Sequence, residues 1–163
     1  MYDTAEAVEE CAGENMNKFM ELAKTYVGTP HINGGDVKGA GLDCCTLVTN
    51  FYAELGYKKI AVRFGYSGDW YCQRHCKEIL LPYLQQYFMR AKRLEAGDLL
   101  SFRWGRSQYA HLAIYLGDGK VLHCDADDGT VITDIYDLKF TDALGKSRIT
   151  GYWRFKDGLF QRT

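Results

Sequence analysis

The chain of 163 residues lacks most of the features that mark a protein as fibrous, disordered or membrane-embedded. It has only 2 prolines, so it contains no proline-rich linker, and no apolar run reaches the length of about 18 residues that a bilayer requires. The net charge of -1 gives no overall attraction to nucleic acid or to an acidic membrane surface. We therefore expect no nucleic-acid partner and no stable membrane insertion.

What the chain does have is core-forming material. Hydrophobic residues make up 47% and aromatic residues 14% of the sequence, which is typical of an ordered globular protein. The length predicts a single domain over residues 1–163. The first residues, MYDTAEAVEECAGE, are acidic and lack the apolar segment of a secretory signal peptide, so we expect synthesis in the cytoplasm. In that reducing compartment the 6 cysteines are expected to be free thiols.

The apolar pattern changes along the chain. Helical spacing predicts helices over residues 15–27, 44–55 and 75–89, the last with a break or kink at Pro82, and a glycine-rich loop over 31–41. After Gly97 the spacing changes to a period of two. It predicts short strands over residues 98–102, 111–116, 120–124, 130–135 and 149–155. Helices followed by an antiparallel sheet indicate the α+β class.

Two adjacent cysteines open the second predicted helix. Asp43 suits the N-cap position, which makes Cys44 the first helical residue. There, the helix dipole and unpaired backbone N–H groups favour a thiolate, the nucleophilic form of cysteine. Cys45 is rotated by about 100° around the helix, so the pair is expected to be one reactive and one packing thiol. The alternative is that both are small buried apolar residues.

A cysteine nucleophile needs a base, and two histidines lie in neighbouring predicted strands. His111 begins one strand and His123 lies near the end of the next, with the turn Gly117-Asp118-Gly119 between them. A two-residue turn places the histidines on opposite faces of the sheet, whereas a three-residue loop or a β-bulge places them on one face. A shared face would let them serve as base and orienting group. We predict the three-residue loop with Gly119 left-handed; two unrelated, hydrogen-bonded strand histidines are the alternative.

Two other groups of residues contain possible metal ligands. Cys72, His75 and Cys76 have a spacing that can hold zinc, but a fourth ligand is missing, so an amphipathic segment with buried thiols is favoured. The acidic residues 125, 127 and 128 lack the closing glutamate of a calcium loop and are interpreted as a solvated loop. We expect neither a metal nor a cofactor.

Four stretches, in this order, resemble the NlpC family of papain-like cysteine peptidases, which cleave bacterial cell-wall peptides. They are GTPHINGG (residues 28–35), KGAGLDCCTLV (38–48), AGDLLSF (96–102) and AHLAIYLGDGKVLHC (110–124). The KGAGLDC form and the intervening YSGDW (66–70) are most similar to the branch associated with phage and prophage tails.

The resemblance implies a papain-like fold, with N-terminal helices packed on a C-terminal antiparallel sheet. It makes Cys44 the nucleophile, His111 the general base and His123 the orienting residue. It implies hydrolysis of amide bonds in peptidoglycan stem peptides without a metal, by a protein that acts at the cell wall or associates with phage tail proteins. Two alternatives stay open: an acyl or amide transferase with the same triad, and a non-catalytic tail or scaffold protein that has kept the fold.

The sequence departs from the family pattern beside the nucleophile. The family usually has Ser-Gly after its Asp-Cys pair, where this chain has Cys45 and Thr46. His31 replaces a tyrosine that typically lies near the nucleophile, and Asn33 replaces a frequent tryptophan. We predict that His31 lines the active-site cleft and donates to an oxyanion. Asp43 and Gly35 are the other residues expected to contribute to substrate or oxyanion binding.

Overall fold

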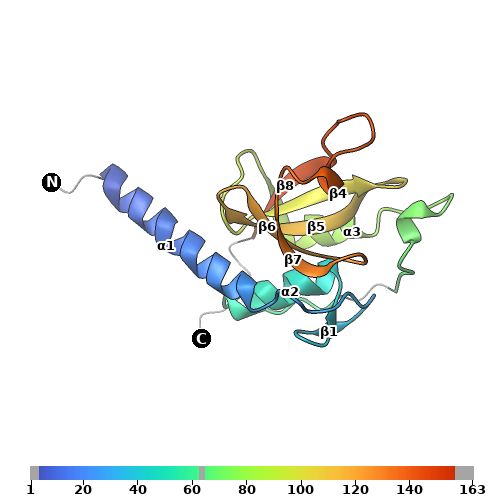
Figure 1. Ribbon diagram of the computed structural model, residues 1–163, viewed down its shortest axis with the longest axis horizontal. Coiled ribbons are helices and arrows are strands. Elements are labelled where there is room, and N and C mark those ends of the chain that lie inside the picture. Colours follow the sequence, from blue (N-terminus) through green and yellow to red (C-terminus); the bar gives the residue numbers. More distant parts are fainter. Residues whose placement is uncertain (1–3, 63–64, 157–163) are drawn as a thin grey trace.

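The computed structural model describes residues 4–62 and 65–156, in which three helices pack against a six-stranded antiparallel sheet (Figure 1). The helices are α1 (Thr4–Lys24), α2 (Cys44–Glu54) and α3 (Leu80–Tyr87). The sheet has the order β3-β8-β4-β5-β6-β7. Its strands are β3 (Phe88–Ala91), β4 (Leu99–Trp104), β5 (Ser107–Gly117), β6 (Lys120–Asp125), β7 (Gly129–Asp134) and β8 (Ile149–Phe155). This arrangement confirms the predicted α+β, papain-like fold.

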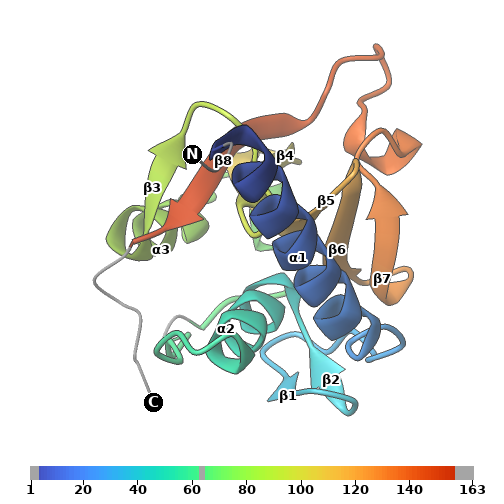
Figure 2. The same cartoon turned by 90° about the vertical axis from the view of Figure 1, so that its left-hand side faces the viewer.

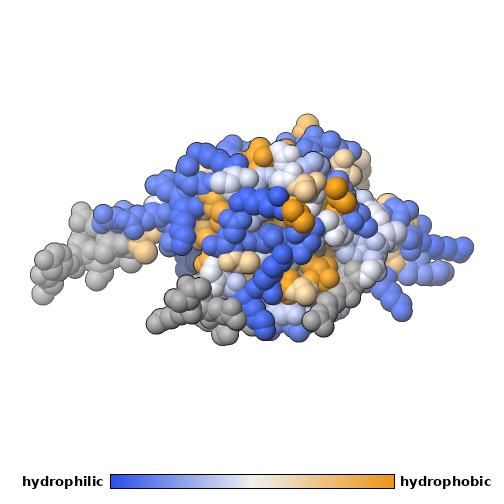
Figure 3. All heavy atoms as spheres, turned by 90° about the horizontal axis from the view of Figure 1, so that it is seen from below, coloured by the Kyte–Doolittle hydropathy of each residue, from blue (hydrophilic) through white to orange (hydrophobic). Residues whose placement is uncertain are grey.

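Smaller elements lie at the edges of this core. The two-stranded sheet of β1 (Asp36–Val37) and β2 (Gly41–Leu42) forms within the segment predicted as a glycine-rich loop. Two single 3₁₀ turns, η1 (Trp70–Cys72) and η2 (Leu138–Phe140), complete the described elements. Seen from below, the surface is mostly hydrophilic, with small apolar patches between the polar side chains (Figure 3). No helix in residues 4–62 and 65–156 is long and apolar enough to cross a membrane.

Apolar side chains cover both faces of the sheet. On one face, α2 lies against β5 and β6, and its Leu47 and Phe51 join Leu112 and Ile114 of β5 in the larger core cluster (Figure 2). On the other face a smaller cluster lies beneath η2. It comprises Leu100, Phe102, Ala113, Val121 and Phe140. Because β5 is buried on both sides, it reads as a nearly continuous apolar run.

The helix predictions were right in kind and partly wrong in extent. The second helix matches its predicted start at Cys44, and α1 begins well before the predicted residue 15. The third helix begins at Leu80 rather than at residue 75, so Pro82 lies in its first turn. A first-turn N–H has no partner within the helix, so proline costs little there, and the predicted break is wrong.

The hairpin between β5 and β6 has a different turn from the one predicted, although its strands reach the predicted pairing beyond the turn. Gly117 pairs with Lys120, which makes Asp118-Gly119 a two-residue turn with φ of 50° and 71°. A bulge between Tyr115 and Gly117 then shifts the pairing by one residue. The predicted three-residue loop is therefore wrong. The bulge restores the shared face instead, since a one-residue shift reverses which side chains lie together.

The same two strands separate where the histidines lie. Within the described strands, the β5–β6 ladder runs from the turn only as far as Ile114 and Leu122. By contrast, β4 pairs with β5 at His111 and, after an irregularity, again at Ser107, and β6 pairs with β7 as far as Asp125. The sheet is thus open between β5 and β6 at the end that faces the start of α2.

Candidate active site

Asp43 holds the start of α2 with one carboxylate oxygen and two neighbouring loops with the other. Oδ1 accepts hydrogen bonds from the backbone N–H groups of Cys45 and Thr46, both at 2.9 Å, and the Thr46 hydroxyl accepts from the Asp43 N–H. Oδ2 accepts from the Gly34 N–H at 2.8 Å and from the Tyr66 hydroxyl. This capping box confirms the predicted N-cap. The carboxylate is buried and fully used by protein donors, so its role is to position the helix and two loops.

Cys44 is the first residue of α2 and lines a cavity of about 250 Å³. Polar side chains line the cavity together with four aromatic residues, Tyr66, Trp70, Tyr71 and Trp104. Cys45, by contrast, has no exposed surface and belongs to the core. The two thiols therefore have the separate environments that their angular offset predicts.

Burial opposes ionisation of the Cys44 thiol. Desolvation raises the pKa of Cys44 well above its usual value, and the neighbouring Asp43 carboxylate raises it further. Hydrogen bonds from the Leu112 backbone and from its own backbone act in the opposite direction but are outweighed. The expectation that the helix N-terminus alone favours a thiolate is thus wrong for the resting protein, because desolvation is the larger effect. Thiolate formation requires a base.

A pair of buried histidines lies close to Cys44, and one of them, His111, can act as that base. His111 Nε2 lies 3.1 Å from His123 Nδ1, and the two rings are nearly perpendicular, at 89°. His111 also lines the cavity with Cys44, and its ring is packed edge-on against Trp104. Burial, followed by the neighbouring His123, lowers the pKa of His111 well below its usual value, so the ring is neutral. A neutral His111 with Nε2 engaged has Nδ1 left to accept a proton.

His123 is completely buried and lies behind His111 rather than in the cavity. Its Nδ1 is also 3.6 Å from Asp125 Oδ2, and its buried Nε2 has no hydrogen-bond partner among residues 4–62 and 65–156. Burial lowers the pKa of His123 to about 4, in spite of the opposing effect of Asp125. A neutral His123 can receive a hydrogen bond from His111 and fix its ring.

Asp125 is the site residue that the sequence analysis missed. Oδ1 accepts from the backbone N–H groups of Asp127 and Asp128, and Oδ2 accepts from Lys139 Nζ at 2.7 Å. Burial raises its pKa, but the hydrogen bonds from Lys139 and the Asp128 backbone outweigh that effect, so the net pKa is lowered and the carboxylate is ionised. The available signal was its position two residues after His123 on one strand, which gives both side chains the same face.

Comparisons with known proteins agree with this geometry. The family model described as "NlpC/P60 family" matches residues 28–148, which is most of the chain and includes each of the residues above. This chain belongs to the NlpC/P60 family.

Solved NlpC/P60 structures have the same fold at low sequence identity. A family member from Bacillus cereus ATCC 10987 is 22% identical with a TM-score of 0.59, over 86% of this chain and 40% of that one. NlpC2 of Trichomonas vaginalis gives 16% identity and a TM-score of 0.57, over 86% and 46%. A lipoprotein-like NLP/P60 protein from Staphylococcus aureus Mu50 is 18% identical with a TM-score of 0.55, over 91% of this chain and 42% of that one. This chain thus spans less than half the length of each. A search of curated proteins found no significant match.

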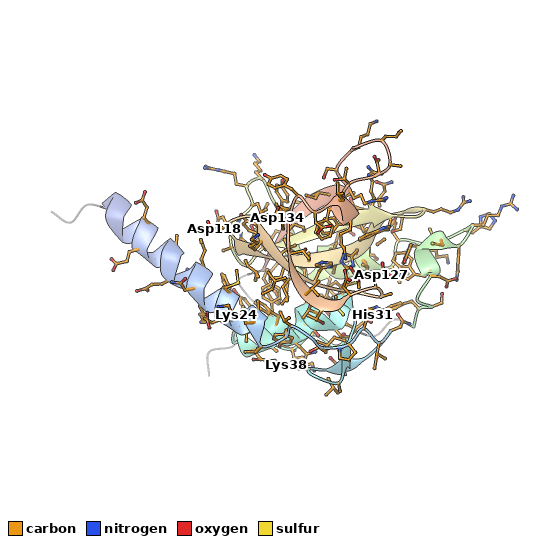
Figure 4. The ribbon with its side chains drawn as sticks, viewed as in Figure 1. Lys24, His31, Lys38, Asp118, Asp127 and Asp134 are labelled. Carbon is orange, nitrogen blue, oxygen red and sulfur yellow. The ribbon has the colours of Figure 1, made fainter. Side chains whose placement is uncertain are left out.

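The other predicted site residues of this NlpC/P60 chain are divided between the cavity and the loops. His31 lines the cavity, as predicted, and lies in the same region as Asp127 (Figure 4). Gly35 is not among the described residues that line it. A Cβ at Gly35 would lie 2.7 Å from the Gly41 carbonyl oxygen, so this glycine allows two loop backbones to approach closely. Its contribution is to loop packing next to the Gly34–Asp43 hydrogen bond.

The cysteine-rich segment after η1 is not built as a helix. Cys72 ends η1 and is exposed, whereas Cys76 is partly buried, and residues 73–79 contain no regular helix. Within residues 4–62 and 65–156, no three histidine, cysteine or acidic side chains lie close enough together to hold a metal ion. The family match confirms the resemblance predicted from the sequence, whereas the phage-tail branch stays a prediction.

Proposed function

We propose that this protein is a cysteine peptidase or amidase that hydrolyses amide bonds in peptidoglycan stem peptides. One observation carries the proposal: Cys44 and His111 line the same cavity, and His111 Nε2 lies 3.1 Å from His123 Nδ1. This is the arrangement of a nucleophile, a base and a group that orients the base. The substrate class is the one that the resemblance to the NlpC family implies, and membership of the NlpC/P60 family supports it.

The first half of the reaction forms an acyl-enzyme. His111 Nδ1 takes the proton from Cys44 Sγ as the sulfur attacks the scissile carbonyl carbon. The backbone N–H of Cys44 is not used by the Asp43 cap, which binds those of Cys45 and Thr46. It lies against the Cys44 sulfur instead, beside the carbon under attack, and in this proposal it donates with the His31 ring to the oxyanion. His111 then gives its proton to the leaving amine, the C–N bond breaks, and the thioester remains.

The second half of the reaction reverses these roles. His111 takes a proton from water, and the hydroxide attacks the thioester carbonyl. The C–S bond breaks, and Cys44 Sγ recovers the proton from His111. Throughout, His123 Nδ1 accepts from His111 Nε2–H, which keeps the proton of neutral His111 on Nε2 and leaves Nδ1 free as the base. In this scheme a neutral thiol and a neutral imidazole are the resting forms, in accord with the burial of both groups.

Digestion of defined peptidoglycan fragments, followed by mass spectrometry, tests the proposal. The wild-type protein is expected to release peptide fragments with one added water, and Cys44→Ala is expected to abolish this while the protein stays folded. Cys45→Ala is the matched control and should keep most of the activity. Added amine acceptors reveal a transferase by an amide product in place of the acid. An inactive wild-type protein, or an active Cys44→Ala variant, would overturn the proposed mechanism.

A further inference from the structure

A carboxylate outside the Cys44–His111–His123 set is held against the second histidine. Asp125 Oδ2 lies 3.6 Å from His123 Nδ1, and the Asp125 side chain is only 16% exposed. The two residues are two positions apart in β6, so their side chains project from one face of the sheet. His123 Nδ1 is therefore flanked by two groups, the His111 Nε2 and the Asp125 carboxylate.

The Asp125 carboxylate is fixed before any substrate arrives. The backbone N–H groups of Asp127 and Asp128 donate to Oδ1 at 3.0 and 2.8 Å, and Lys139 Nζ donates to Oδ2 at 2.7 Å. Lys139 comes from η2, which packs over the same face of the sheet, and it also contacts Asp128. With donors on both oxygens, the carboxylate has little freedom to turn away from His123.

The proton movements of the proposed reaction place a positive charge on His111, with the His123 ring between it and this carboxylate. When Cys44 loses its proton, the S–H bond breaks and an N–H bond forms at His111 Nδ1. The resulting imidazolium donates from Nε2 to His123 Nδ1, so the charge is shared toward a ring that contacts Asp125. In a buried site, a fixed negative charge stabilises a nearby positive charge far more than it does in water.

We propose that Asp125 is a positioning residue that acts through His123 to stabilise the imidazolium of His111. The functional set thus becomes Cys44–His111–His123–Asp125. Lys139 partly neutralises the charge of Asp125 and so limits its effect on the histidines. This proposal rests on the proposed cysteine-peptidase function. Asp125 stays ionised throughout, and the transferred proton stays on His111 until the leaving amine takes it.

The charges around the two histidines allow a test with opposite signs. His111 faces His123, Asp125, Lys139 and His31. His123 faces Asp125, Lys139, Asp128 and Asp137. Asp125 raises the pKa of both rings and Lys139 lowers it. Removing the charge of Asp125 should therefore lower the two histidine pKa values, and removing that of Lys139 should raise them.

Titration of the imidazole C–H signals by NMR measures this directly, without substrate. In Asp125→Asn the pKa values of His111 and His123 should fall, that of His123 by about one unit. In Lys139→Gln they should rise, since the backbone amides of residues 127 and 128 still hold Asp125. The control Asp134→Asn removes the same charge from the opposite end of the β6–β7 pair, near Asp118 (Figure 4), and should leave both values unchanged.

The pH profile of hydrolysis provides the functional readout. In Asp125→Asn the acidic limb of kcat/KM should move to lower pH, and kcat should fall about tenfold with little change in KM. A loss of structure alone would lower the active fraction without moving that limb. Unchanged histidine titrations in a folded Asp125→Asn protein, or shifts of the same sign in both variants, would overturn the inference. An inactive wild-type protein would overturn the proposed function instead, and the NMR titrations would still decide the role of Asp125.

Discussion

Two Asp–Lys pairs lie at opposite ends of the β6–β7 pair, and their surroundings differ. Lys120 and Asp134 meet at 3.3 Å with side chains that are 45% and 48% exposed. Lys139 and Asp125 meet at 2.7 Å with exposures of 22% and 16%, next to a buried imidazole pair. Water and salt weaken the first pair, whereas the second acts on groups that are out of water. The same two residue types are therefore peripheral at one end and part of the candidate site at the other.

The backbone differs between the two ends as well. At the turn end, β5 and β6 are paired across a tight turn, and the bulge next to Gly117 sets their register. At the site end, the two strands part, and the start of α2 with Cys44 faces the opening. The bulge at the turn end thus places His111 and His123 on one face of the sheet. At the site end, these two side chains meet.

The largest expected difference between the two ends is in activity. Replacing the base by His111→Ala should lower the rate of peptide hydrolysis by about 10²–10⁴-fold, since general base catalysis is typically worth that much. Lys120→Ala, at the turn end, should leave the rate unchanged. Hydrolysis of a defined stem peptide measures both, with circular dichroism to verify folding. A His111→Ala protein with wild-type activity would show that another group takes the proton from Cys44.

The second difference is the dependence of stability on pH. Because burial holds the pKa of His123 at about 4, the unfolded chain binds a proton at higher pH than the native protein does. The free energy of unfolding should therefore fall as the pH drops from about 6.5 to about 4, by about 3 kcal/mol from this group. Urea unfolding at a series of pH values measures the slope.

His123→Gln should flatten that slope, and Asp134→Asn should not. The pKa of the Asp134 carboxyl is lowered by hydrogen bonds from the Tyr136 backbone and from Lys120, so its stabilising effect is lost only at still lower pH. A His123→Gln protein with the full wild-type slope would contradict the assignment of the pH dependence to the buried ring.

The third test breaks the turn end itself. A Cβ at Gly117 would meet Met16 Cγ at 2.7 Å, and its φ of 96° disfavours side chains. Gly119→Ala would meet only Ile135 Cγ2, at 3.8 Å, with φ of 71°. We expect Gly117→Ala to cost about 2 kcal/mol and Gly119→Ala about 1 kcal/mol in the free energy of unfolding. Equal costs would show that the bulge is not the constrained position.

The smallest expected effect is that of the exposed ion pair. Asp134→Asn should leave the melting temperature unchanged within error, both at physiological and at high salt, since exposed pairs contribute little. Asp125→Asn should lower it measurably, because it leaves Lys139 and the buried His123 with weaker partners. Thermal unfolding of the two variants side by side checks this, and a larger loss in Asp134→Asn would reverse the comparison.

The sequence was sufficient where a local rule governs the structure. The Asp43 cap and the start of α2 at Cys44 depend on contacts within a few residues, and the different surroundings of Cys44 and Cys45 follow from their angular offset on the helix. The strand pattern after Gly97 likewise predicted five strands that the structure contains. Periodicity was less reliable for the third helix, since the apolar spacing before Leu80 comes from an irregular segment that packs against the core.

Other features depend on elements that are distant in the sequence. The turn motif allowed two registers, and only the fit of the whole hairpin into the sheet decided for the bulge next to Gly117. Helix position argued for an acidic Cys44 thiol, but its burial beneath the loops reverses the direction of the pKa shift. By itself, the sequence determined which residue types were present and which way their local backbone runs. The tertiary structure decided which of these side chains are ionised and which of them meet. Desolvation and the approach of Lys139 to Asp125 arise only when separate elements pack together.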